Sequence, residues 1–142
     1  MLSEDTLRRI GNLDRELIEH RIRTLFERWA YGDLDGVLEY LAPDVQIATP
    51  GFWSSVVRPA HGWDEVAKAL RLWHDTFENI TSVLHEILID GDRAVVHRTA
   101  VGRRRDSGER YQCDFIEFFR FRDGLVVEFS DYPDIGWSRK KA

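Results

Sequence analysis

Three ionisable residues in the second half of the chain, Arg98, Glu117 and Asp131, could together carry out acid–base chemistry. Each lies in a segment that alternates like a strand, among apolar neighbours that include several phenylalanines. A carboxylate can act as a general base, and a carboxylic acid can act as a general acid. An inward-facing arginine needs a carboxylate partner, because an unpaired buried charge is costly. Glu117 or Asp131 could supply that partner.

The same alternation sorts the neighbours of these residues into two faces. One face of the segment 110–122 carries Cys113, Phe115, Glu117, Phe119 and Phe121. The opposite face carries Gln112, Asp114, Ile116, Phe118 and Arg120. Two further sets share a face within their own strands, namely Arg98, Ala100 and Gly102, and Val127, Phe129 and Asp131. Periodicity alone leaves open which face points inward.

The sequence contains little evidence for a metal site, a cysteine nucleophile or a cofactor site. The five histidines include no pair at the i, i+4 spacing of a helix or the i, i+2 spacing of a strand, so we expect no metal site. The single cysteine, Cys113, cannot form a disulfide within one chain, and we expect a small apolar residue rather than a nucleophile. Phosphate-loop, HExxH and GxSxG motifs are absent, and we expect no cofactor.

Composition predicts one soluble domain over residues 1–142, with a short C-terminal tail from about 135. The chain is 43% hydrophobic and 32% charged, which is ordinary for a globular domain. Its net charge of −5 argues against a nucleic-acid partner, and no apolar run is long enough for a membrane helix. The first residues lack the apolar stretch of a signal peptide, so we expect a cytoplasmic protein.

The first half of the chain is predicted to be helical. Apolar residues recur at helical spacing up to Trp29, with Ser3 or Asn12 as the N-cap and Gly11 as a possible break. Gly32 suits the left-handed residue that ends this helix. The remaining predictions are a second helix capped by Asp33 and ended by Pro43, a strand over 45–49, an irregular segment over 50–62, and a third helix from about Trp63 to Phe77.

The second half reads as an antiparallel meander. Strands are predicted over 80–89, 93–104, 110–122 and 125–132, joined by turns at Asp90-Gly91-Asp92, Asp106-Ser107-Gly108 and Asp123-Gly124. Because the helices and the antiparallel strands are segregated along the chain, we expect an α+β fold rather than a parallel sheet.

Several phrases resemble the NTF2-like superfamily, in particular SnoaL-like polyketide cyclases, ketosteroid isomerase and limonene epoxide hydrolase. They are RWAYGDLDGVLEYLAPDV, HGWDEVAKAL, DGDRAVV and FFRFRDGLVVEFSDYPD, and they span roughly residues 20–134. The resemblance implies a cone, in which a curved, mostly antiparallel sheet is wrapped by three or four helices around one pocket. It also implies that the faces carrying Arg98, Glu117 and Asp131 point into that pocket.

The resemblance assigns roles to these three residues. Asp131 falls on the aspartate that activates water in the epoxide hydrolase, and Arg98 falls on the arginine that links its two catalytic carboxylates. Glu117 falls on the catalytic aspartate of the cyclases and on the protonated aspartic acid of the isomerase. A protonated carboxyl group there could donate a hydrogen bond to a developing enolate.

The remaining catalytic positions of these relatives hold different residue types here. The second carboxylate of the epoxide hydrolase falls on Ala100, and its tyrosine and asparagine fall on Phe52 and Ser54. The isomerase's base falls on Thr49 and its helix tyrosine on Leu25. We expect these five residues to contact a ligand, together with Cys113, Phe115 and Phe129.

Two hypotheses of different class follow. In the first, the chain is a cofactor-free acid–base enzyme for an apolar carbonyl or epoxide compound, with Asp131, Glu117 and Arg98 as catalytic residues. In the second, it is a non-catalytic small-molecule binding protein with a degenerate site. Under either hypothesis we expect a homodimer formed through the outer sheet face, because outward apolar residues such as Ile116 and Phe118 are otherwise hard to explain.

Overall fold

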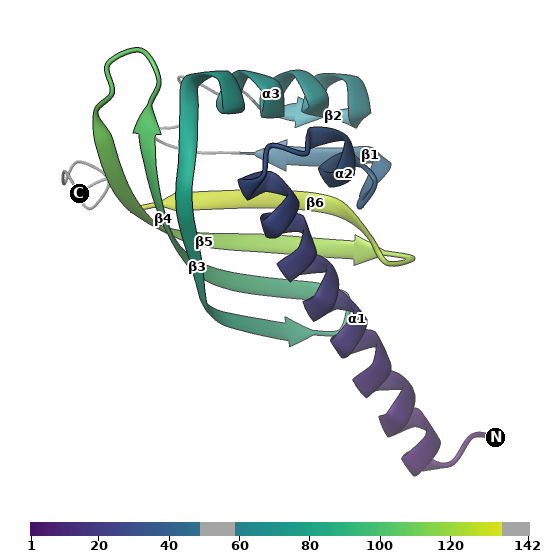
Figure 1. The fold of residues 1–142 in the computed structure, drawn as a ribbon. Coiled ribbons are helices and arrows are strands. Elements are labelled where there is room, and N and C mark those ends of the chain that lie inside the picture. Colours follow the sequence, from purple (N-terminus) through teal and green to yellow (C-terminus); the bar gives the residue numbers. More distant parts are fainter. Residues whose placement is uncertain (49–58, 135–142) are drawn as a thin grey trace.

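A six-stranded curled sheet with helices against its concave side forms the body of the protein (Figure 1). The computed structural model describes residues 1–48 and 59–134. The strand order is β2-β1-β6-β5-β4-β3. Neighbouring strands are antiparallel except β1 and β6, which run parallel. The predicted α+β cone with a mostly antiparallel sheet is therefore confirmed, and its described part contains three helices.

Helix α1 (Glu4–Ala30) begins at Ser3, whose hydroxyl accepts a hydrogen bond from the Thr6 amide at 3.2 Å. The predicted break at Gly11 was wrong, because α1 runs through that position without interruption. A glycine inside a helix costs only about 1 kcal/mol, which the rest of a long helix can absorb. The helix ends as predicted, with Gly32 in the left-handed region at φ 75°.

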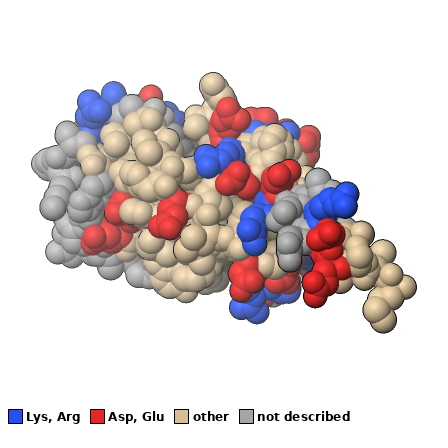
Figure 2. All heavy atoms as spheres, turned by 90° about the horizontal axis from the view of Figure 1, so that it is seen from below, with Lys and Arg blue, Asp and Glu red and all other residues tan. Residues whose placement is uncertain are grey.

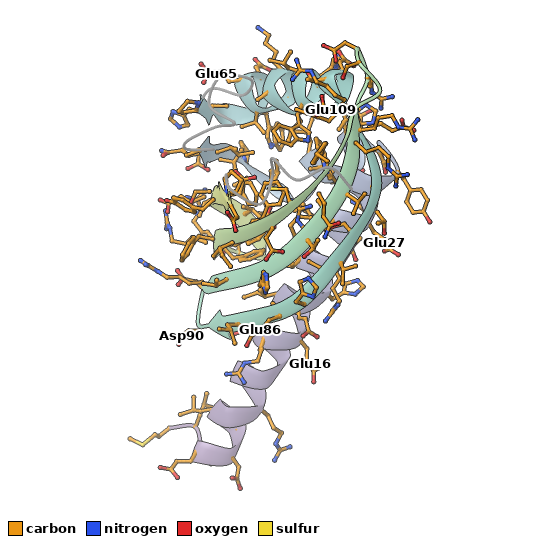
Figure 3. All side chains as sticks on the ribbon, turned by 90° about the vertical axis from the view of Figure 1, so that its left-hand side faces the viewer. Glu16, Glu27, Glu65, Glu86, Asp90 and Glu109 are labelled. Atoms are coloured by element: carbon orange, nitrogen blue, oxygen red, sulfur yellow. The ribbon has the colours of Figure 1, made fainter. Side chains whose placement is uncertain are left out.

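Only the C-terminal half of α1 packs into the sheet. Ile18, Ile22, Leu25 and Phe26 are buried, whereas the N-terminal half projects beyond the sheet (Figure 1). Figure 3 shows the same division, with Glu27 beside the curved strands and the helix before Glu16 extending past them. None of the described helices is long and apolar enough to cross a membrane. In Figure 2 basic and acidic side chains are interspersed on the face seen from below.

The middle of the chain differs from the prediction at two boundaries. Helix α2 (Leu34–Leu38) is capped by Asp33, which accepts from the Gly36 amide at 3.0 Å, but it ends before Pro43. Strand β1 (Leu41–Ala48) already contains Pro43. Strand β2 (Ala60–His61), which lies inside the segment predicted to be irregular, pairs with β1 and leads into α3 (Gly62–Thr76).

The meander is close to the prediction. Strands β4 (Arg93–Arg104) and β5 (Arg110–Arg122) have the predicted bounds, and β6 (Leu125–Pro133) is one residue longer. Strand β3 (Phe77–Asp90) starts three residues before the predicted Ile80, because Phe77 already has extended dihedrals. Asp123 and Gly124 both have positive φ, as a two-residue hairpin turn requires.

Two apolar clusters fill the concave side. The main cluster joins α1, α2 and α3 to β1, β4, β5 and β6. A smaller cluster consists of Phe77, Ala100, Cys113 and Phe115, with Trp73 and Tyr111 packed against it. The faces that carry Arg98, Glu117 and Asp131 are the buried ones, so the orientation implied by the resemblance agrees with the observed burial.

Candidate active site

Arg98 and Glu117 form a buried two-point ion pair on the concave face. Nε of Arg98 donates to Oε1 of Glu117 at 2.8 Å, and an Nη2 proton goes to Oε2 at 3.0 Å. Only 7% of the Arg98 side chain and 1% of the Glu117 side chain are exposed. Two parallel N–H···O bonds to one carboxylate are the pattern of an ionised glutamate facing a guanidinium. Glu117 therefore supplies the partner that an inward arginine needs.

Two aromatic rings lie against the Arg98 guanidinium. Its Cζ lies 4.7 Å from the ring centre of Phe26 on α1 and 4.6 Å from that of Phe115 on β5. The Ser82 hydroxyl on β3 accepts a further hydrogen bond at 3.3 Å. Burial acts to lower the pKa of Arg98, but the charge and hydrogen bonds of Glu117 outweigh it and leave the pKa raised. Arg98 is thus a permanently charged group in a fixed orientation.

Asp131 brings a second carboxylate to the same place. It lies directly opposite Glu117 in the antiparallel pair of β5 and β6, with only 8% of the residue exposed. Directly opposite residues in such a pair have Cβ atoms about 5 Å apart on one face of the sheet. The charge of Asp131 also contributes to the raised pKa of Arg98. The site therefore holds two carboxyl groups beside one guanidinium.

A mostly apolar pocket opens over these three side chains. Its cavity volume is about 90 Å³. That is room for a small organic molecule rather than for a single water. Besides Arg98, Glu117 and Asp131, the lining consists of Leu25, Phe26, Trp29, Val37, Leu41, Ile47, Ala69, Leu70, Trp73, Phe119, Val126 and Phe129.

The residues expected to contact a ligand divide into three groups. Leu25 and Phe129 line the pocket. The remaining described ones belong to the smaller apolar cluster instead, namely Ala100, Cys113 and Phe115. Thr49, Phe52 and Ser54 lie outside the described residues. Burial raises the pKa of Cys113 to about 12, although the charge of Arg98 acts in the opposite direction.

Sequence reasoning found only Leu25 on the helical wall of the pocket and missed most of that wall. Phe26 and Trp29 on α1, and Ala69 and Leu70 on α3, line the pocket opposite the sheet. Their helical spacing marks them as inward-facing, but a stripe of this kind does not separate pocket residues from core. Trp73 on α3 also lines the pocket. Trp63, by contrast, is 45% exposed and its indole N–H donates to the Leu41 carbonyl at 2.9 Å.

Comparison with known proteins identifies the fold and the family. A family model described as a SnoaL-like domain matches residues 22–129. An NTF2-like protein of unknown function from Burkholderia pseudomallei K96243 is 28% identical, with a TM-score of 0.74 over 87% of this chain and 98% of that one. No protein with a curated description matches.

Two similar structures come from proteins with named activities. An LEH-like epoxide hydrolase from M. tuberculosis is 20% identical, with a TM-score of 0.72 over 87% of this chain and 86% of that one. IdmH, a putative polyketide cyclase from Streptomyces antibioticus, is 21% identical, with a TM-score of 0.70 over 85% and 94%. At these identities the likeness concerns the fold alone. Since the family match covers most of the chain, the protein belongs to the SnoaL-like family of the NTF2-like superfamily.

Proposed function

We propose that this protein is a cofactor-free acid–base enzyme of the isomerase, cyclase or hydrolase type, acting on an apolar compound with a carbonyl or epoxide group. The observation that carries this proposal is the buried pair of opposite carboxylates, Glu117 and Asp131, of which Glu117 is bonded through both oxygens to Arg98. Asp131 is then the carboxylate that can gain or lose a proton without breaking that ion pair. Asp131 is the general base of the proposed reaction.

Arg98 stabilises negative charge in this mechanism. Its guanidinium lies in the pocket wall among aromatic rings, where water does not screen it. A cation fixed in such surroundings stabilises an oxyanion without reorganising during the reaction. Glu117 then orients Arg98, instead of acting as the protonated acid that the resemblance implies. With both its oxygens accepting hydrogen bonds, Glu117 is bonded as an ionised carboxylate.

For a carbonyl substrate, the proton that Asp131 removes is returned later in the reaction. Asp131 removes a proton from the carbon next to the carbonyl, and the C–H electron pair moves to give an enolate whose oxygen faces Arg98. Returning the proton from Asp131 to another carbon completes an isomerisation. In a cyclisation the enolate carbon attacks a second carbonyl, whose C=O π electrons move to its oxygen, and the alkoxide takes the proton back from Asp131. For an epoxide, Asp131 takes a proton from the attacking water while the ring C–O bond breaks. The same proton then neutralises the alkoxide.

Two comparisons support this range of reactions. An epoxide hydrolase and a putative polyketide cyclase share the fold with this chain. Each reaction class can be catalysed by a carboxylate base in a pocket that excludes bulk water. The apolar lining favours substrates with a large hydrocarbon or aromatic part.

The second candidate is a binding protein that performs no chemistry. It is favoured by Ala100, which occupies the position of the epoxide hydrolase's second carboxylate and is packed in the smaller apolar cluster. In this case Arg98 and Asp131 recognise a hydroxyl or acid group of the ligand, and the aromatic side chains hold its apolar part.

We also propose a homodimer that forms through the outer face of the sheet. Ile116, Phe118 and Tyr132 are 40%, 46% and 48% exposed, although they are large apolar or aromatic residues on a sheet. Phe118 and Tyr132 form an edge-to-face pair with ring centres 5.6 Å apart. A second copy on this face would bury these rings.

A thermal-shift screen tests for the proposed ligand class. The panel holds apolar ketones, polyketide-like phenolics, epoxides and small carboxylates, and it is run on the wild type, on Asp131→Asn and on Asp123→Asn. A ligand that binds the folded state raises the melting temperature with its concentration. We expect one class to stabilise the wild type and Asp123→Asn equally, and Asp131→Asn differently. A panel with no shift in any of the proteins contradicts the proposed substrate class.

A further inference from the structure

The outer face of the sheet carries a group of three potential metal ligands outside the pocket. His85 on β3, His97 on β4 and Asp114 on β5 come from three adjacent strands, and their donor atoms all lie within 4.8 Å of one another. Glu86, the neighbour of His85, is labelled in Figure 3 on the curved strands between Asp90 and Glu109. In the described residues no second trio of histidine, cysteine or carboxylate side chains comes this close.

A β-bulge brings His85 to this position. Leu84 pairs with Arg98 and Glu86 pairs with His97, so His85 is an extra residue on β3. Leu84 packs against the core, while His85 is exposed. The bulge turns the His85 ring towards His97, and the two ring centres are 4.7 Å apart. A bulge of this kind re-aims a side chain that strict alternation would place elsewhere.

Thr99, next to these three residues, contacts two of them, His85 and Asp114. Its hydroxyl donates to one oxygen of Asp114 and lies 2.6 Å from Nε2 of His85. The other carboxylate oxygen of Asp114 is 3.0 Å from Nε2 of His97. These two hydrogen bonds fix the orientation of the Asp114 carboxylate.

We propose that His85, His97 and Asp114 form a binding site for a divalent transition metal, with Zn²⁺ as the best fit. Two imidazole nitrogens and one carboxylate oxygen are ligands that zinc accepts in four-coordinate sites, with the fourth position open. Tetrahedral bonds of about 2.0–2.1 Å place donors about 3.3 Å apart. The present separations reach that value through small side-chain rotations, which the 38% exposed His97 and 34% exposed Asp114 side chains permit.

This site is separate from the pocket of the proposed catalysis, and it lies beside Ile116 on the outer sheet face proposed for the dimer, because His97 pairs with Ile116. By alternation along β4, His97 points away from the face that carries Arg98. The expectation of no metal site rested on spacing within one helix or strand, and such spacing does not detect three ligands on three different strands. Thr99 is the outer residue that would position Asp114 on the metal.

Metal titration of tag-free protein, stripped of metal with a chelator, tests the proposal directly. Zinc binding is followed by calorimetry, and Co²⁺ binding by the visible absorption that tetrahedral cobalt acquires. The variants are His97→Ala, His85→Ala, Asp114→Asn and Thr99→Val, with the exposed helix residue His20→Ala as a control. Each variant's circular dichroism is compared with that of the wild type.

The expected result is one equivalent of metal per chain in the wild type and in His20→Ala. His85→Ala, His97→Ala and Asp114→Asn should bind at least about tenfold more weakly, since each removes one of three ligands. Thr99→Val should bind about 10–100-fold more weakly, as for other residues that orient a ligand. Absence of binding by the wild type would overturn the proposal, and so would equal affinity in the wild type and His97→Ala.

Discussion

Glu117 on β5 and Asp131 on β6 lie directly opposite each other in the sheet, and both side chains face the apolar pocket. Like charges in this arrangement repel, and the repulsion is strong where water is excluded. Arg98 relieves it by pairing with one member, Glu117, through two hydrogen bonds. The two carboxylates thus have different surroundings, which is how one site can hold groups with separate tasks.

Breaking the Arg98–Glu117 pair should destabilise the fold strongly. Arg98→Ala leaves Glu117 buried and without its counter-charge, and Glu117→Ala does the same to Arg98. Each should lower the free energy of unfolding by about 3–5 kcal/mol, measured by urea denaturation. The double variant Arg98→Met/Glu117→Leu should recover most of the loss, because it leaves no uncompensated charge.

The exposed pair of Arg120 and Glu128 on β5 and β6 is the control, with an N···O distance of 2.7 Å. Arg120→Gln should leave the urea midpoint nearly unchanged, since water screens this pair. Similar losses of unfolding free energy for Arg98→Ala and Arg120→Gln would show that the buried pair stabilises the fold no more than the exposed pair does.

Gly102 is predicted to be intolerant of a side chain because Tyr111 covers it. A Cβ atom at Gly102 would lie 2.6 Å from Cζ of Tyr111, the residue that pairs with Gly102 across β4 and β5. Gly102→Ala should cost about 1–3 kcal/mol of unfolding free energy, because it forces Tyr111 away from Phe77. In a Tyr111→Ala background the same change should cost far less. Equal costs in the two backgrounds would contradict the proposed clash.

Cys113 should be unreactive in the folded protein. Burial raises the pKa of its thiol to about 12, against the opposing charge of Arg98. At pH 8 only about one thiol in 10⁴ is then ionised, and the thiolate is the reactive form. The rate of alkylation by iodoacetamide should rise with pH and be at least about a hundredfold lower in native than in denatured protein. Rapid alkylation of native protein at pH 8 would show that the thiol is accessible and activated.

The proposed dimer makes a prediction for the outer sheet face. Wild-type protein should sediment as a dimer at micromolar concentration, and Phe118→Lys should shift it towards the monomer, because the charge would be buried in the interface. Leu72→Lys on α3, which is also exposed, should remain dimeric. A monomeric wild type would refute the dimer.

The strands of the meander could be predicted because local signals define them. Alternation and the Asp123-Gly124 turn predicted the bounds of β5 and the residues that share each of its faces, whereas the choice of the buried face came from the resemblance. The pairing of β1 with β6 could not be predicted, since no turn joins these parallel strands and their contact depends on the whole fold. The start of β3 was missed because Phe77 continues the apolar spacing of the preceding helix.

The site could be predicted in part. Alternation places Arg98, Glu117 and Asp131 on their faces, but it does not say how far along a strand the pocket extends. Ala100, Cys113 and Phe115 share those faces, yet Trp73 and Tyr111 pack over them and make them part of a separate cluster. The packing of Trp73 over these residues depends on where the helices cross the sheet. That position is set by the tertiary structure and cannot be predicted from local sequence patterns.

The central claim is that Asp131 performs chemistry, and the most direct test is the chemical fate of a bound ligand. A compound that stabilises the wild type is incubated with wild type, Asp131→Asn and Asp123→Asn, and the mixture is analysed by mass spectrometry and NMR. We expect product from the wild type and Asp123→Asn, and at least about 10²-fold slower formation by Asp131→Asn with its melting temperature preserved. Equal turnover by Asp131→Asn would remove Asp131 from the mechanism, and unchanged ligand in every sample would identify a binding protein instead.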